Sequence, residues 1–321
     1  MKDALIFGVR GQDGMYLTEL LIEKGYRVHG QYKLEEGANS ILPPFSSSLF
    51  ANRNFRPLEG SVANRGYVHE LVKSIRPAEI YYLASNHELD FSIENYRKSC
   101  DVNLDGLAEA LSALAAPSLR GRLFYASSSN IFYNTIQSPQ NEETPHSPGT
   151  LYGLFKSTAM SLISMYRSKF GVFACAGILY NHESPRRKHY FLPKKIVSTA
   201  VAIKKGGQEK LTIGDLSAER DWGYAGDFVR AMWMMLQAER SQDYIIGTGI
   251  THSVEWVINL VFSELGLDWR EHVICDPTLQ RITYPGLLKA DITKIKTELG
   301  WKPEIEFSDV LRIMIRSELE S

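Results

Sequence analysis

The stretch that decides the fold is residues 4–14, ALIFGVRGQDG, in which a short apolar run passes directly into glycines spaced G-x-x-G-x-x-G. The apolar run predicts a buried strand, and the periodicity of residues 16–21 predicts a helix. Gly25 ends that helix, and residues 27–30 predict a second strand. A strand, a glycine turn, a helix and a strand within about 30 residues are typical of a dinucleotide-binding unit.

The glycine turn predicts a binding site for a pyrophosphate. Its glycines let the backbone turn tightly and approach a phosphate closely, and the amino end of the helix offers free N–H groups and positive potential. The alternative interpretation is a tight turn that holds no ligand. The predicted cofactor-binding residues of the turn are Gly8, Arg10, Gly11, Gln12, Asp13 and Gly14.

The residues after the second strand bear on the choice between NADP and NAD. The sequence there is QYK at residues 31–33, so no acid follows directly to bind a ribose hydroxyl. Arg10 and Lys33 are cations that suit a 2′-phosphate, whereas Glu35 and Glu36 favour NAD. We therefore expect NADP as the cofactor, with NAD as the alternative.

Two further apolar segments, residues 79–85 and 123–129, predict buried strands that end in small residues. Between them, residues 102–116 have helical spacing. This alternation predicts an α/β fold with a doubly wound parallel sheet, in which ligands bind at the carboxyl ends of the strands. Leu83 and Ala84, at such an end, are therefore predicted to contact the cofactor, although small residues also occur where a strand simply enters a loop.

Tyr152 and Lys156 are the residues that indicate catalysis. The run of residues 157–163 predicts a helix, on which a spacing of four residues stacks a phenol and an ammonium on one face. The ammonium stabilises the phenolate, so the phenol can exchange a proton near neutral pH, as hydride transfer at an alcohol carbon requires. Taken alone, the same spacing is found in many amphipathic surface helices.

Composition excludes several other classes of protein. The chain has 321 residues, of which 44% are hydrophobic and 23% charged, and its formal net charge is −1, so we expect a globular protein that binds no nucleic acid. Three scattered cysteines indicate neither a disulfide framework nor a metal site. No apolar run is long enough to span a membrane or to serve as a signal peptide, so we expect a cytoplasmic location.

The chain resembles the extended short-chain dehydrogenase/reductase superfamily through the glycine turn, the serines at 127–129 and the pair Tyr152 and Lys156. Within that superfamily it is most similar to the GDP-mannose 4,6-dehydratase group. The segments that carry this similarity are 11–17, GQDGMYL; 181–187, NHESPRR; 220–223, RDWG, with Asp227; 251–254, THSV; and 299–303, LGWKP.

The resemblance implies roles for individual residues. Ser128 would hydrogen-bond the sugar hydroxyl, Tyr152 would be the acid/base, and Lys156 would bind the nicotinamide ribose. A GDP-sugar would be the substrate, bound by Asn181, Arg186, Arg220 and Arg281. Asn181 would lie near its diphosphate, and Arg220 and Arg281 would clamp its phosphates. The simpler alternatives are a strand cap for Ser128, a turn former for Asn181 and surface charges for the arginines.

The chain departs from the dehydratase pattern at three positions. Where the pattern reads Ser-Thr-Ser-Glu, with the Glu acting as the acid/base of water elimination across C5 and C6, this chain has Asn130. An amide cannot carry that proton. A pair of arginines after the second strand is reduced to Lys33, and the Asp that contacts adenine is replaced by Ser61.

These departures favour a 4-keto reductase or epimerase acting at C4 of a GDP-hexose or of its 4-keto-6-deoxy derivative. A second possibility is a true 4,6-dehydratase in which Glu88 or Asp90 has taken over the proton transfer. A third is a sensor that binds a nucleotide sugar or dinucleotide without turnover, because a fold does not establish activity.

The remaining expectations concern organisation. Residues 1–180 are expected to form mainly the dinucleotide-binding domain, and 181–321 mainly a smaller mixed domain that binds the nucleotide sugar, with the chain crossing back to the sheet. Helical periodicity is present at 192–204, 227–238, 254–265 and 309–319. The helices around 92–115 and 151–169 carry apolar residues on more than one side, which predicts a homodimer or homotetramer.

Overall fold

The structure is a computed structural model that describes residues 1–33, 49–86, 92–208, 210–279 and 286–321. The chain forms two compact units. The first comprises Met1–Tyr133, Pro145–Leu179 and Val229–Tyr244, and the second comprises Asn134–Thr144, Tyr180–Phe228 and Ile245–Ser321. Each unit is therefore assembled from separate segments of the chain. That residues 1–180 bind mainly the dinucleotide and residues 181–321 mainly the nucleotide sugar stays a prediction.

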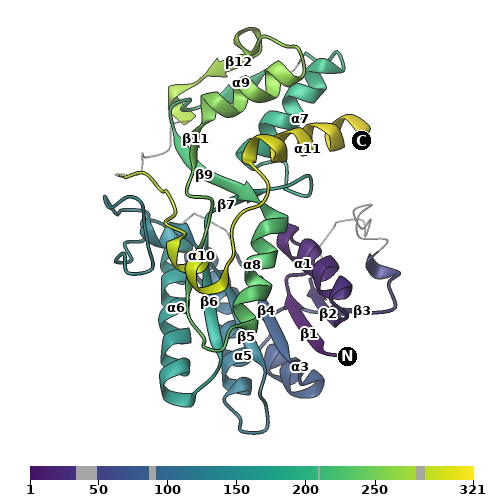
Figure 1. Cartoon of the computed structure of the whole chain (residues 1–321), viewed down its shortest axis with the longest axis vertical. Helices are drawn as coiled ribbons and strands as arrows, with labels where there is room; N and C mark the ends of the chain where they lie inside the picture. The colour runs from purple at the N-terminus through teal and green to yellow at the C-terminus, as the bar shows by residue number, and fades with distance from the viewer. Residues whose placement is uncertain (34–48, 87–91, 209, 280–285) are drawn as a thin grey trace. The chain divides into compact units, whose positions relative to one another are not determined.

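The first unit is built on the parallel strands β6-β5-β4-β1-β2-β3 of a sheet whose full strand order is β10-β6-β5-β4-β1-β2-β3 (Figure 1). Of β10, only Tyr244 belongs to the first unit. The strands are β1 Asp3–Phe7, β2 Arg27–Tyr32, β3 Phe55–Glu59, β4 Glu79–Tyr82, β5 Arg122–Ser128, β6 Ala174–Leu179 and β10 Tyr244–Ile246. From β3 to β6 each neighbouring pair is parallel. The predicted doubly wound sheet is thus confirmed.

Helices cover both faces of this sheet because the order of the strands reverses. The chain winds outward from β1 to β3 and then returns to β4 on the other side of β1, so right-handed crossovers place the helices between β3 and β6 on the opposite face from α1. The helices are α1 Gln12–Glu23, α3 Tyr67–Ile75, α4 Ile93–Cys100, α5 Gly106–Leu114, α6 Leu151–Phe170 and α8 Ala225–Gln237. Trp233 of α8 packs near the end of α1, where Lys24 Nζ lies 3.7 Å from the centre of its ring. Helix α5 packs against both α3 and α6, in agreement with a single layer.

Two boundaries differ from the sequence prediction. Strand β2 continues to Tyr32 instead of ending at Gly30, because Gln31 and Tyr32 pair with Leu58 and Glu59 of β3. The expected helix at 102–116 opens as a π-helical segment, η1 Asp101–Asp105, before α5. Neither difference was visible in the hydrophobic pattern, since pairing partners and π-helical turns leave no periodic signal of their own.

The glycine turn lies where the winding reverses, between β1 and β4. Gly8 has a φ of +86°, which side-chain-bearing residues rarely adopt, and a Cβ there would lie 2.9 Å from the backbone nitrogen of Ala84. A Cβ on Gly14 would lie 2.6 Å from the Cα of Val9. The sequence of the turn therefore permits β1, α1 and the end of β4 to approach one another at the position where such folds bind ligands.

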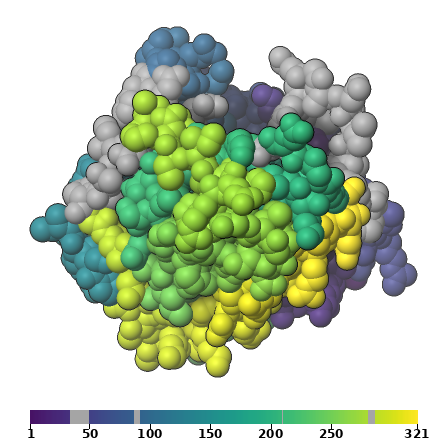
Figure 2. Space-filling model, turned by 90° about the horizontal axis from the view of Figure 1, so that it is seen from above, coloured from purple at the N-terminus to yellow at the C-terminus, as the bar shows by residue number. Residues whose placement is uncertain are grey.

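The second unit contains small sheets and a group of helices. Strand β9 Glu219–Tyr224 lies between β11 Thr251–Ser253 and β7 Asn181–Glu183, and β12 Val273–Cys275 pairs with β8 Leu211–Ile213. The predicted loop at 181–189 thus begins as a strand. The helices are α7 Leu192–Lys204, α9 Val254–Glu264, α10 Thr293–Leu299 and α11 Phe307–Glu320, and Figure 2 shows α9 and α11 side by side.

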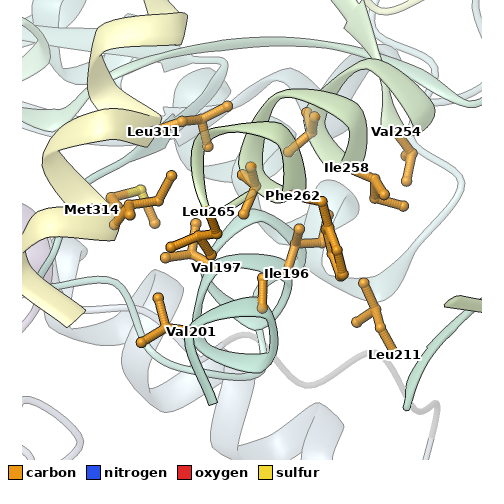
Figure 3. Close-up of a cluster of buried hydrophobic side chains, with 14 of the residues drawn as sticks. Ile196, Val197, Val201, Leu211, Val254, Ile258, Phe262, Leu265, Leu311 and Met314 are labelled. Atoms are coloured by element: carbon orange, nitrogen blue, oxygen red, sulfur yellow. The ribbon is translucent and has the colours of Figure 1, made fainter. Parts of the chain in front are cut away.

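Helices α7, α9 and α11 enclose the core of the second unit (Figure 3). Ile196, Phe262 and Leu311, one from each helix, are fully buried there. Trp301 is also buried, and its indole nitrogen donates to the backbone oxygen of Asp227 over 3.0 Å. The four helical segments expected from periodicity are all present, within two residues at each end.

Within the described residues, no helix is both long enough and apolar enough to cross a membrane. No cluster of His, Cys, Asp and Glu suited to a metal ion occurs in the same part of the chain.

Candidate active site

Helix α6 presents Tyr152 and Lys156 on one face, as the spacing predicted. The helix begins at Leu151, directly after Thr150, whose hydroxyl accepts a hydrogen bond from the backbone N–H of Gly153 over 3.0 Å. Lys156 Nζ lies 5.4 Å from the centre of the Tyr152 ring. Both side chains therefore project from the first turns of the helix toward the sheet of the same unit.

Lys156 is buried in this position, with 1% of its surface exposed. Its Nζ donates to the backbone oxygen of Ala126, at the end of β5, over 2.7 Å. Burial lowers the pKa of Lys156 to about 7, because removal of water disfavours the charged form. The amine is thus both anchored to the strand and able to change its charge near neutral pH.

Gly153, between these two residues, lets α6 approach the end of β5. A Cβ at this position would lie 2.5 Å from the backbone oxygen of Asn130, a distance that real structures avoid. Asn130 belongs to the 3₁₀ helix η2 Ser129–Phe132, which follows β5 directly. The glycine therefore determines how closely Tyr152 can come to the residues that follow β5.

We expect Gly153→Ala to impair catalysis more than folding. Displacing α6 should cost about 1–3 kcal/mol of stability, as overpacking does. A shift of roughly 1 Å in Tyr152 should lower kcat on the order of 10²-fold. Urea unfolding and single-turnover hydride transfer measure the two effects, and Ser161→Ala, on an exposed face of the same helix, is the control. Wild-type kcat in the Gly153 variant would contradict this reading of the contact.

Ser128 and Asn130 are directly hydrogen-bonded. The Ser128 side chain is 8% exposed, and its Oγ accepts from the backbone N–H of Asn130 over 3.2 Å and from Asn130 Nδ2 over 3.1 Å. A serine hydroxyl has two acceptor positions and one donor. Both acceptor positions are therefore occupied, and the hydroxyl hydrogen is left to donate to another oxygen.

The glycine turn has the geometry that a pyrophosphate needs. Helix α1 begins at Gln12 with Gly11 as its N-cap, and no side chain among the described residues makes a capping hydrogen bond there. The amino end of a helix is a favourable position for an anion, because its first N–H groups have no partner within the helix and the helix dipole adds positive potential. Together with Gly8 and Gly14, whose missing side chains let β1, α1 and the end of β4 approach one another, the turn fits a dinucleotide.

Gln31 is a residue that the sequence analysis did not recognise as structural support for this turn. Its side chain is 3% exposed, accepts from the N–H of Gly8 over 3.2 Å and donates to the backbone oxygen of Gly60 over 2.6 Å. It therefore links the glycine turn to the end of β3. The available signal was a glutamine at the end of a strand, and it becomes informative only when the strand is known to continue to Tyr32.

Of the predicted 2′-phosphate ligands, Arg10 lies near the ring of Tyr32, at the end of β2, and Lys33 follows that strand. The Arg10 guanidinium is 5.9 Å from the centre of the Tyr32 ring, and Lys33 is exposed directly after β2. Leu83 and Ala84 follow β4 and are half-buried. Glu35 and Glu36, which argued for NAD, lie outside the described residues.

Of the predicted substrate ligands, Asn181 and Arg220 belong to one sheet of the second unit. Asn181 pairs with Trp222, two residues after Arg220 on β9, so the two side chains are on the same face of that sheet. Arg186 lies in the turn after β7, where its backbone N–H donates to Ser184 Oγ over 3.2 Å. Arg281, Glu88 and Asp90 lie outside the described residues.

The burial of Lys156 predicts a particular dependence of stability on pH. Its pKa is about 7 in the folded chain but about 10.4 in a solvated one. Between these values the unfolded chain binds more protons, so the free energy of unfolding should rise with pH from about 7 to 10. Lys156→Met should lack this rise. Urea unfolding of both proteins at pH 6 and pH 9 measures the difference, and parallel pH curves would contradict the burial argument.

Comparison with known proteins agrees with this geometry. The profile of the family described as GDP-mannose 4,6 dehydratase matches residues 5–314. The chain is 36% identical to GDP-mannose 4,6 dehydratase 1 of Arabidopsis thaliana, over 99% of this chain and 90% of the relative. It is 33% identical to the human GDP-mannose 4,6 dehydratase, over 99% of this chain and 91% of the relative.

Solved structures share the fold at lower identity. The UDP-glucose 4-epimerase of Thermotoga maritima, solved with UDP-glucose, has a TM-score of 0.85 and 21% identity, with 98% of each chain covered. The dTDP-glucose 4,6-dehydratase of Streptomyces venezuelae, solved with NAD, has a TM-score of 0.83 and 21% identity, with 99% of this chain and 97% of that chain covered.

A parallel doubly wound sheet, a glycine turn at its switch point and a Tyr-x-x-x-Lys helix beside it define the extended short-chain dehydrogenase/reductase class of NAD(P)-dependent nucleotide-sugar enzymes. Within that class, the chain belongs to the GDP-mannose 4,6-dehydratase family. The resemblance noted from the sequence motifs is thereby confirmed.

Proposed function

We propose that this chain is an NADP-dependent enzyme that acts on the 4-keto group of a GDP-linked 6-deoxyhexose. It either reduces this group or uses it to epimerise the sugar. The observation that carries the proposal is the pair formed by Ser128 and Asn130. Asn130 stands where the dehydratase pattern has its glutamate, and its amide donates to Ser128 Oγ over 3.1 Å. An amide held in this way orients a serine and transfers no proton.

Each residue of the site has a separate role in a carbonyl reduction. When bound, the nicotinamide cofactor supplies the hydride chemistry. Tyr152 gives a proton to the oxygen at C4, and Lys156, whose Nζ lies 5.4 Å from the Tyr152 ring, supplies positive charge beside that phenol. Ser128 donates its hydroxyl hydrogen to the same oxygen, which fits a ketone because a carbonyl oxygen can only accept.

The proposal is tested by offering the enzyme two substrates. With NADPH and a GDP-4-keto-6-deoxyhexose, we expect oxidation of the cofactor and formation of a GDP-6-deoxyhexose. With GDP-mannose and catalytic NADP, we expect no 4-keto-6-deoxy product beyond a slow background. The measurements are nicotinamide absorbance and mass spectrometry of the sugar nucleotide. Elimination from GDP-mannose at a normal enzymatic rate would overturn the preference for reduction.

A 4,6-dehydratase is the second candidate, and the identity of the relatives supports it, since the chain is 36% identical to a protein named for that activity. It requires another acid/base in place of Asn130, for which Glu88 and Asp90 were the sequence candidates. Replacing each by its amide and measuring oxidation and elimination separately would decide between the two. Loss of elimination alone in one variant would favour the dehydratase.

For the cofactor, we propose NADP in preference to NAD. Arg10 and the exposed Lys33 are the cations near the end of β2, where Tyr32 contributes an aromatic ring instead of the acid that binds a ribose diol. Arg10→Ala should therefore raise the KM for NADPH and leave the KM for NADH nearly unchanged. An equal effect on both cofactors would speak against recognition of a 2′-phosphate by Arg10.

We also propose that the enzyme forms a homodimer, or a tetramer built from such dimers, through α4 and α6. These helices contact one another and expose apolar side chains, among them Ile93 at 65% and Leu154 at 46%. A second copy would cover them, since an isologous interface buries the same patch on both subunits. Leu154→Asp should yield monomers in analytical ultracentrifugation. The control is Leu319→Asp, because the wild-type Leu319 side chain on α11 is also exposed, at 42%, but lies outside the proposed interface.

A cytoplasmic location remains our proposal. All three cysteines, Cys100, Cys175 and Cys275, are free thiols in the structure. Unpaired cysteines are usual in a reducing compartment.

A further inference from the structure

Tyr125 is a buried side chain that the proposed chemistry has not used. It lies on β5, is 0% exposed, and its hydroxyl is one of the buried polar atoms in the described residues for which no hydrogen-bond partner is present. Buried polar groups normally have partners, because an unpaired one loses its bonds to water. A hydrogen bond of the hydroxyl therefore does not explain why a tyrosine occupies this position.

The ring of Tyr125 supplies that reason, because it faces the amine of the site. Lys156 Nζ lies 4.7 Å from the centre of the Tyr125 ring and 5.4 Å from that of Tyr152. The same nitrogen donates to the backbone oxygen of Ala126 over 2.7 Å. The ammonium is thus held by one carbonyl and bordered by two aromatic rings, in a site from which water is excluded.

We propose that Tyr125 is a positioning residue whose ring holds the ammonium of Lys156 charged and in place beside Tyr152. An ammonium over an aromatic face is attracted by the ring quadrupole, and the attraction is strongest where water is absent. Burial alone would favour the neutral amine, so the ring opposes the effect of burial. The inference deepens the proposed function, on which it rests for the role of Lys156.

Other titratable groups around Lys156 do not account for its charge. Tyr82, on β4, has its ring 6.2 Å from that of Tyr125, and burial raises the pKa of both phenols far above their usual value. Asp105 on η1 and Glu109 on α5 act on Tyr82. Among the described residues, Tyr152 also interacts electrostatically with Tyr125. Near neutral pH, Tyr125 and Tyr82 are therefore neutral, and Tyr125 affects Lys156 through its ring.

The test compares two substitutions at position 125. Tyr125→Phe keeps the ring and removes the hydroxyl without a partner, whereas Tyr125→Leu removes the ring and keeps an apolar side chain. Each is combined with Lys156→Met, and urea unfolding of the four variants and their parents is followed from pH 5 to pH 10. The difference between a lysine protein and its methionine partner isolates the titration of Lys156 from all other groups.

In the Tyr125→Leu background, we expect the titration of Lys156 to move to lower pH by about one unit, because the charged form has lost its attraction to the ring. In the Tyr125→Phe background it should stay at the wild-type position. Identical titrations in the Leu and Phe backgrounds would overturn the proposal. This measurement needs neither substrate nor cofactor, so it stands even if the proposed reaction is wrong.

Catalysis gives a second readout. The basic limb of the pH profile of kcat for reduction should move to lower pH in Tyr125→Leu, because Lys156 loses its charge at lower pH, and kcat at pH 7 should fall about tenfold, since a weaker positive charge supports Tyr152 less well. Tyr125→Phe should restore both. A Leu variant that is less stable but keeps both the wild-type titration of Lys156 and the wild-type pH profile would show a purely structural role and overturn the proposal. If the stability titration shifts while the profile does not, the ring holds Lys156 but the proposed function fails.

Discussion

Tyr152→Phe should abolish hydride transfer while leaving the cofactor bound. Without its hydroxyl, the side chain cannot donate a proton to the oxygen at C4, and the loss of a general acid/base costs on the order of 10² to 10⁴ in rate. The ring itself is retained, so its contact with Lys156, 5.4 Å from Nζ to the ring centre, should persist. Single-turnover oxidation of NADPH, followed by absorbance, measures the chemical step, and fluorescence titration measures cofactor affinity.

The control is Tyr166→Phe, since Tyr166 lies on the same helix and is half-buried. It should have wild-type kinetics. If Tyr152→Phe lost cofactor affinity in proportion to its rate, the phenol would serve binding and not proton transfer. A variant that kept a substantial rate would remove Tyr152 from the mechanism altogether.

Asn130→Glu should convert the active site toward dehydration. Asn130 follows Ser128 at the end of β5, and its Nδ2 lies 3.1 Å from Ser128 Oγ, so a carboxyl group there would return an acid/base to the place where the dehydratase pattern has one. Since a general acid/base contributes on the order of 10² to 10⁴ in rate, elimination from GDP-mannose should rise by about 10²-fold or more. Release of a 4-keto-6-deoxy sugar nucleotide is quantified by mass spectrometry.

Asn130→Gln is the matched control, because glutamine has the size of glutamate but no transferable proton. It should not gain elimination. In both variants the hydrogen bond to Ser128 is altered, so 4-keto reduction should decline in both to a similar extent. Equal elimination by the Glu and Gln variants, or by the wild type, would show that the missing carboxylate is not what limits dehydration.

Much of this protein was determined by its sequence alone. Residues 4–14 specified a strand, a tight turn and a helix in close contact, because only glycine tolerates the φ of +86° at Gly8 and the proximity of Ala84. Tyr152 and Lys156 share a face because a helix brings residues four apart into register. Local periodicity and local sterics act between residues that are near in sequence, so a sequence pattern records them directly.

The tertiary structure decided the contacts between distant segments. Gln31 reaches Gly60, Gly153 lies against Asn130, and Tyr125 faces Lys156, and in each case the partners come from different elements. Such contacts depend on strand order and on how a helix packs against a strand, neither of which leaves a repeating pattern in the chain. The sequence therefore identified the groups that can do the chemistry, whereas the packing of α6 on β5 determined which atoms hold them in place.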